Sequence, residues 1–108
     1  MNNTEELICG LDTAQIEELK AEKRALVLVE ITAERKVCKA IFKEPTFDAL
    51  RASNKISKAD EMKALETIYN NCIVKADKEV TNRDVLKIKA VEALMARVNK
   101  TTAEAKNL

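Results

Sequence analysis

The clearest hydrophobic pattern in the chain is a pair of short runs before its midpoint. The first, ALVLVEI at residues 25–31, is dominated by Leu, Val and Ile and is too short for a buried helix. The second, KVCKAIFK at residues 36–43, alternates polar and apolar positions with a period close to two. Only the polar segment TAER separates the runs, so the pattern predicts an antiparallel β-hairpin over residues 25–44.

The alternation assigns the hairpin residues to two faces. If TAER is a four-residue loop, Ile31 lies opposite Lys36 and Val29 lies opposite Cys38. We expect the wholly apolar inner face to meet the helices, and it contains Val27, Val29, Ile31, Cys38, Ala40 and Phe42. The other face, called the outer face below, mixes charged residues with four aliphatic ones, Leu26, Leu28, Val37 and Ile41. The hairpin also has two edges that are open to pairing with another strand.

A helix is predicted before the hairpin, over residues 11–24. Asp12 followed by Gln15 forms a capping-box pattern at its start. Its apolar stripe is thin and consists mainly of Ile16 and Leu19, so this helix is expected on the surface. Residues 1–10 are expected to be loosely ordered.

Pro45 ends the second strand because it lacks the N–H that a strand ladder requires. Thr46 is then placed to cap a helix that begins at Phe47. Both phenylalanines, Phe42 and Phe47, are expected to pack at this corner of the core.

The rest of the chain has helical periodicity, and about three helices are predicted over residues 46–99. The short helix from Phe47 is expected to end near residue 54. Ser57 with Asp60 indicates the start of the next helix, which runs to about Ile73. The segment KADKEV is expected to be a polar loop. Thr81 with Asp84 caps the last helix, from about residue 82 to 98, and residues 100–108 are expected to fray.

Composition fits one α+β domain spanning residues 1–108. Apolar residues make up 46% and charged residues 34%, with one glycine and three aromatic residues, so the core must be mostly aliphatic. No apolar run approaches the ~18 residues of a membrane span, and the N-terminus has no secretory pattern. We therefore expect a cytoplasmic protein that does not contact membranes.

The chain offers little for catalysis or for metal binding. It has no histidine, its only glycine is Gly10, and its three cysteines are widely spaced. This argues against a Ser-His-Asp site, a phosphate-binding loop and a zinc site, so we expect a non-enzymatic protein without cofactor or metal. All three thiols are expected to be free, with Cys38 and Cys72 buried and Cys9 reactive.

The charge distribution argues against nucleic-acid binding. Residues 1–35 carry eight acids and four bases (4 − 8 = −4), and residues 36–108 carry ten acids and fifteen bases (15 − 10 = +5). Acids are interleaved with the bases in the second part, so no basic stripe forms.

The outer face of the hairpin must be covered, because four aliphatic side chains on a two-stranded sheet are too many to leave in water. Two alternatives remain open. The first helix can cover the face through Ile16 and Leu19, or a partner chain or second copy can do so. In the second case Leu26, Leu28, Val37 and Ile41 are partner-binding residues.

Two segments, KAIFKEPTFDAL and ALETIYNNCIVKADKE, resemble the tail assembly chaperones of long-tailed bacteriophages, with similarity over about residues 25–98. The resemblance implies a strand hairpin that leads through a proline into a helical bundle. It also implies a non-enzymatic factor in the host cytoplasm that binds the tape-measure protein and tail-tube subunits. Alternatives are a small virion structural protein, such as a head–tail connector, and a small regulatory or nucleic-acid-binding domain.

Overall fold

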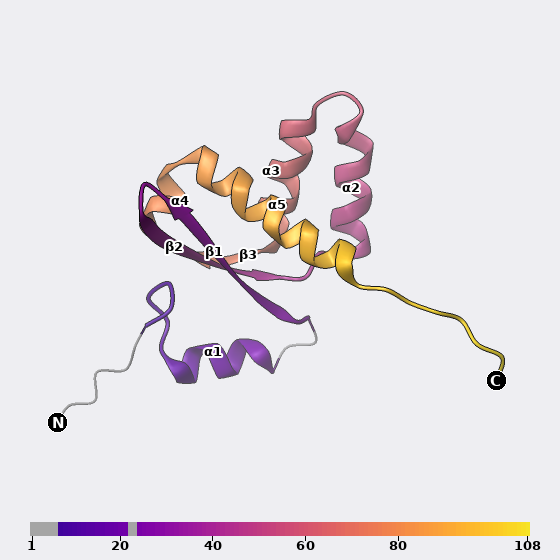
Figure 1. Ribbon diagram of the computed structural model, residues 1–108, viewed down its shortest axis with the longest axis horizontal. Coiled ribbons are helices and arrows are strands. Elements are labelled where there is room, and N and C mark those ends of the chain that lie inside the picture. The colour runs from indigo at the N-terminus through magenta and orange to yellow at the C-terminus, as the bar shows by residue number, and fades with distance from the viewer. Residues whose placement is uncertain (1–6, 22–23) are drawn as a thin grey trace.

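The computed structural model describes residues 7–21 and 24–108, and within them it shows an α+β fold of five helices around a three-stranded antiparallel sheet (Figure 1). The predicted fold class is therefore confirmed, although the sheet has one more strand than expected. The elements in chain order are α1 (Thr13–Lys20), β1 (Leu26–Ala33), β2 (Lys36–Lys43), α2 (Phe47–Ser57), α3 (Glu61–Cys72), β3 (Ile73–Ala76), α4 (Lys78–Asn82) and α5 (Asp84–Lys100).

The hairpin of β1 and β2 is present, but its turn is shorter than predicted. Ile31 pairs with Cys38, and the chain reverses through Glu34 and Arg35, which both have left-handed backbone angles (φ 54° and 66°). Two consecutive positive φ values make a type I′ turn, whose twist matches that of the strands. The expected pairing of Ile31 with Lys36 was wrong. The observed register is displaced by two residues from the predicted one. Because two is an even number, every side chain stays on its predicted face.

The third strand, β3, was not predicted, because its residues were assigned to a helix end and a loop. It pairs antiparallel with β2 through Ala40 with Ala76 and Phe42 with Ile73, with an irregularity between Ile41 and Phe42. The sheet order is thus β1-β2-β3, which covers one edge of the hairpin and leaves β1 at the other edge.

The inner face of the sheet forms one wall of the core. Helices α2, α3 and α5 lie on this side, and α1 lies on the opposite side (Figure 1). All six residues predicted for the inner face are buried. Phe42 is 0% exposed and meets Tyr69 of α3 edge-to-face, with ring centroids 5.7 Å apart. From α5, the core receives Leu86, Ala90, Val91 and Leu94.

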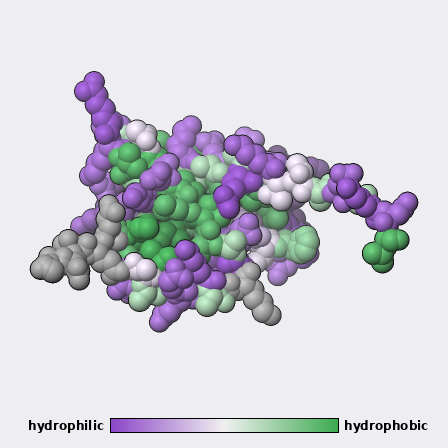
Figure 2. Space-filling model, turned by 60° about the horizontal axis from the view of Figure 1, so that its bottom comes forward, coloured by the Kyte–Doolittle hydropathy of each residue, from purple (hydrophilic) through white to green (hydrophobic). Residues whose placement is uncertain are grey.

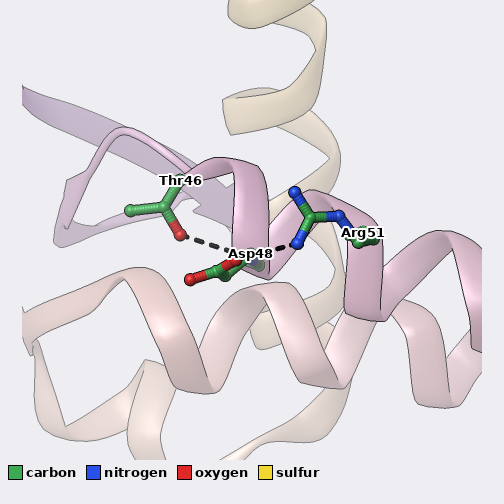
Figure 3. Close-up of polar contacts among 4 residues, drawn as sticks. Thr46, Asp48 and Arg51 are labelled. Carbon is green, nitrogen blue, oxygen red and sulfur yellow. Dashed lines mark hydrogen bonds and ion pairs between the residues drawn. The ribbon is translucent and has the colours of Figure 1, made fainter.

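Thr46 caps α2 as predicted. Its hydroxyl accepts a 3.1 Å hydrogen bond from the Ala49 N–H, and Asp48 pairs with Arg51 one turn later (Figure 3). Phe47, however, is 85% exposed, so its predicted place in the core was wrong. Phe47 is the first residue of α2, and the residue of this first turn that faces the core is Ala49, which is buried.

Several predicted helix limits also differ. The first helix is described only from Thr13 to Lys20, with the expected capping box of Asp12 and Gln15, and positions 22 and 23 of the prediction lie outside the described residues. The second helix ends at Ser57 rather than near residue 54. Asp60, rather than Ser57, is the N-cap of α3 and accepts from the Lys63 N–H.

The predicted cap at Thr81 was wrong, because residues 78–82 form the short helix α4 where a polar loop was expected. Val80 of α4 is fully buried, which anchors this helix to the core. Helix α5 then begins at Asp84, after Arg83, without a side-chain cap.

The chain leaves the domain after Lys100. Residues 101–108 have no regular secondary structure and are all exposed, as expected for this segment (Figure 1). Of residues 1–10, positions 1–6 lie outside the described residues, and Ile8 and Leu11 form an isolated β-bridge. Among the described residues, none of the helices combines the length and apolar character that crossing a membrane requires.

Candidate functional site

The candidate site is the outer face of the sheet. Strand alternation places Leu26, Leu28, Glu30 and Thr32 of β1 on this face, next to Val37, Lys39, Ile41 and Lys43 of β2. Leu28 lies directly opposite Ile41, and Leu26 lies opposite Lys43. The aliphatic residues therefore form a contiguous group at the end of the hairpin nearest Pro45, with Val37 set apart toward the turn.

The four predicted partner-binding residues differ in accessibility. Leu28 and Val37 are 47% and 51% exposed, and Leu26 is half-buried. Ile41 is only 4% exposed although it lies on the outer face, and it is not part of the core cluster on the inner face. The accessible apolar part of the outer face thus consists of Leu26, Leu28 and Val37, with Ile41 beneath them.

Helix α1 covers part of this face. It lies on the outer side of the sheet (Figure 1), and its two apolar residues, Ile16 and Leu19, are half-buried. No residue of α1 is fully buried. The side of the molecule that carries α1 and the outer face still shows a broad apolar area surrounded by polar side chains (Figure 2). The first helix is therefore an incomplete cover.

The charged residues on the outer face are mostly basic. Lys39 and Lys43 come from β2, and Lys75 joins them from β3, where it pairs with Ile41 in the sheet register. Glu30 is the only acid on the strand positions of this face, opposite Lys39. A partner that binds this face would need an apolar surface at its centre and acidic groups around it.

The N-terminal segment is fastened to this side of the sheet at Lys39. The Lys39 carbonyl accepts from the Asp77 N–H at 2.9 Å and from the Cys9 thiol at 3.2 Å. The Asp77 carboxylate in turn accepts a 2.7 Å hydrogen bond from the Lys39 N–H. One backbone position of β2 therefore joins the segment before α1 to the segment after β3.

Cys9 was expected to be accessible, and this expectation was wrong. Its side chain is buried, and burial together with the nearby Asp77 carboxylate raises the pKa of the thiol from 9.0 to about 11. A thiol is nucleophilic only as its thiolate, so this environment suppresses its reactivity. Cys38 and Cys72 are buried and free, as predicted, and burial raises the pKa of Cys72 as well.

A hollow of about 430 Å³ lies away from the outer face, between α3 and α5. Lys87 extends over the Tyr69 ring there, 5.5 Å from its centroid, and also pairs with Asp84 at 3.8 Å. Burial raises the pKa of the Tyr69 hydroxyl. This environment keeps the phenol protonated and the lysine paired, which suits packing rather than proton transfer. Within the described ranges, no three His, Cys, Asp or Glu side chains come together as metal ligands would.

Sequence reasoning located β1 and β2 of this face but missed the contribution of β3. Lys75 and Asp77 were assigned to a polar loop, because IVKA is too short to show a strand period. The signal that the sequence offered was Asp77, a good N-cap residue, which marks the start of the short helix α4 and therefore the end of the segment before it.

Comparison of the chain with protein-family models, with curated proteins and with solved structures finds no match.

Proposed function

We propose that this protein is a non-enzymatic binding protein that uses its outer sheet face to cover apolar helical segments of another protein, as a phage tail assembly chaperone does. The observation that carries the proposal is that Leu28 and Val37, both exposed, lie on one sheet face together with Leu26. Other exposed large apolar residues, such as Phe47, Met62 and Val85, lie singly on different helices. The resemblance of residues 25–98 to tail assembly chaperones supplies the client, a tape-measure protein, and a second partner, the tail-tube subunit.

The chemistry of the face specifies the client further. An amphipathic helix can place its apolar stripe on Leu26, Leu28 and Val37 and its acidic residues near the surrounding lysines. Fully burying a Leu or Val contributes about 1.5–3 kcal/mol. Because Leu28 and Val37 are about half exposed, each can add only about half of this on binding. Such contacts are weak individually, which suits a factor that must release its client.

The proposal is tested with the substitution Leu28→Lys, which places a charge at the centre of the face. The matched control is Val85→Lys, because Val85 is also an exposed aliphatic residue but lies at the start of α5. Each variant is co-expressed with the protein encoded by the adjacent gene, which the proposal expects to be very long and helical. Soluble client and the co-purified complex are then measured.

The wild type and Val85→Lys should keep the client soluble and co-purify with it, and Leu28→Lys should not. Circular dichroism should show both variants folded, since a lysine on a partly polar face can extend to water. The proposal fails if no such client is encoded nearby, or if Leu28→Lys binds the client as the wild type does. If Leu28→Lys unfolds and Val85→Lys does not, Leu28 packs against α1 inside the monomer. The outer face would then have no binding role either.

A nucleic-acid-binding domain and a virion structural protein are the competing proposals. Acids are interleaved with the bases of the second part of the chain, and some of them pair with these bases, as Glu79 does with Lys36 and Glu92 with Lys89. We therefore expect no DNA or RNA complex tighter than about 100 μM at physiological salt. A sub-micromolar complex in a titration with labelled DNA or RNA would favour the nucleic-acid alternative, and incorporation into purified virions would favour the structural one.

A further inference from the structure

Within residues 7–21 and 24–108, no strand pairs with the edge of β1 that faces away from β2. The Glu44 N–H donates to the Ala25 carbonyl at 3.0 Å, which continues the ladder of the hairpin at every second residue. Val27, Val29 and Ile31 therefore direct their backbone groups toward β2. The alternate residues direct their N–H and C=O groups away from the sheet, and these are Leu26, Leu28, Glu30 and Thr32.

This edge lacks the features that usually prevent strand addition. β1 is eight residues long, contains no proline and pairs with β2 without a bulge. Its only charged residue is Glu30. Soluble proteins normally shorten, twist, charge or cover such an edge, so an edge this long and regular indicates a surface that is used for pairing.

Beside the edge lies a groove of about 920 Å³ between β1 and the C-terminal half of α5. On the α5 side it is lined by Ala93, Ala96, Arg97 and Lys100. The two alanines are exposed and have small side chains, so another backbone or helix can approach this part of α5 closely. The groove therefore supplies space next to the backbone groups that need partners.

We propose that the edge of β1 pairs antiparallel with β1 of a second copy of this chain, so that two three-stranded sheets become one. The charges around the groove select this occupant. Glu30 and Glu44 lie on one side and Arg97 and Lys100 on the other, and none of them forms an ion pair with another described residue. A two-fold dimer brings one patch against itself, so two acids and two bases within that patch are self-complementary.

The outward backbone groups also restrict the register. Hydrogen-bonded pairs must join outward residues, and the register that uses all four places Leu28 opposite Glu30 and Leu26 opposite Thr32 of the other copy. A shift of two residues in one direction would place Glu30 opposite Glu30, where like charges repel. In the favoured register the two Leu28 side chains are diagonal neighbours on one continuous outer face. The dimer does not depend on the proposed function, because it uses the strand edge and not the face.

The test is the substitution Glu30→Pro, with Glu30→Gln as its control. Proline removes one outward N–H but no bond to β2, because the Glu30 backbone points away from the hairpin. Sedimentation over a range of protein concentrations measures the dimer dissociation constant of each form. We expect a wild-type dimer and a dimer a few-fold weaker for Glu30→Gln, which loses one charge of the interface but keeps its backbone N–H. Association should be about ten-fold weaker again, or more, for Glu30→Pro.

Amide hydrogen exchange on the wild type provides a measurement that needs no variant. The amides of Leu26, Leu28, Glu30 and Thr32 should become protected as the protein concentration rises, while those of Val27 and Val29 should be protected throughout. A wild type that stays monomeric at its highest soluble concentration overturns the proposal. So does a dimer whose edge amides exchange freely, or one that Leu28→Lys dissociates and Glu30→Pro leaves intact, because that dimer would use the outer face.

Discussion

The two phenylalanines offer a direct test of the fold, because they lie five residues apart and in opposite environments. Phe42 has no exposed surface and packs edge-to-face on Tyr69. Replacing a fully buried Phe with Ala loses its burial and leaves a cavity, at a cost of about 3–5 kcal/mol. Domains of this size have about 5–15 kcal/mol of stability in total. Phe42→Ala should therefore lose a large fraction of its free energy of unfolding.

Phe47→Ala is the matched control. Its ring is exposed to solvent at the first position of α2, so the substitution removes almost no buried surface. Surface substitutions of this kind usually change stability by less than about 0.5 kcal/mol. Phe42→Leu, which keeps most of the volume but loses the aromatic contact, should cost an intermediate amount, about 1–2 kcal/mol.

Urea denaturation followed by far-ultraviolet circular dichroism measures all three variants. With an m-value of about 1.5 kcal/mol/M, Phe42→Ala should lower the midpoint by about 2–3 M, and Phe47→Ala should leave it within about 0.3 M. Equal losses for the two alanine variants would contradict the placement of Phe47. A loss below about 1 kcal/mol for Phe42→Ala would mean that the sheet is packed with its other face inward.

Three further predictions concern the ends of the elements and the N-terminal segment. At pH 8, Cys9 should react with a thiol reagent about a hundred-fold more slowly than an exposed cysteine, since its pKa lies about two units above 9.0, and equal rates in native and denatured protein would exclude the burial of Cys9. Asp77→Ala should cost about 1–3 kcal/mol in urea denaturation, because the Lys39 N–H loses a charged acceptor, and Asp77→Asn should cost less. Thr46→Ala should cost about 1 kcal/mol by the same assay through loss of the cap to Ala49, with Thr46→Ser as the control that retains the hydroxyl.

The faces of the hairpin could be predicted from sequence, and its register could not. Period-two alternation assigns each residue to a face regardless of turn length, provided that the error is an even number of residues. The turn itself was not recognisable, because Glu34 and Arg35 are not the Asn and Gly that normally adopt left-handed angles in a type I′ turn. The buried face was therefore predicted correctly with the wrong cross-strand partners.

The missed features share a physical cause, which is that they depend on contacts between distant parts of the chain. β3 is a four-residue strand formed because the edge of β2 is available, and its sequence carries no period of its own. Cys9 is buried because the turn before α1 reaches the Lys39 carbonyl, thirty residues away. Ile41 lies on the outer face as predicted, and its burial there agrees with the alternative in which the first helix covers this face, but the extent of that cover could not be predicted.

The late position of β3 in the sequence has a consequence during synthesis. The hairpin is complete once residue 43 has been made, but the strand that covers the edge of β2 begins only at Ile73. At about 5–20 residues per second, these thirty residues take the ribosome roughly 2–6 s. Throughout that interval the nascent hairpin exposes both of its edges and its inner apolar face, whereas helix α1, which covers part of the outer face, has already been made. Neighbouring nascent chains on one messenger RNA are therefore the partners against which this sequence most needs protection.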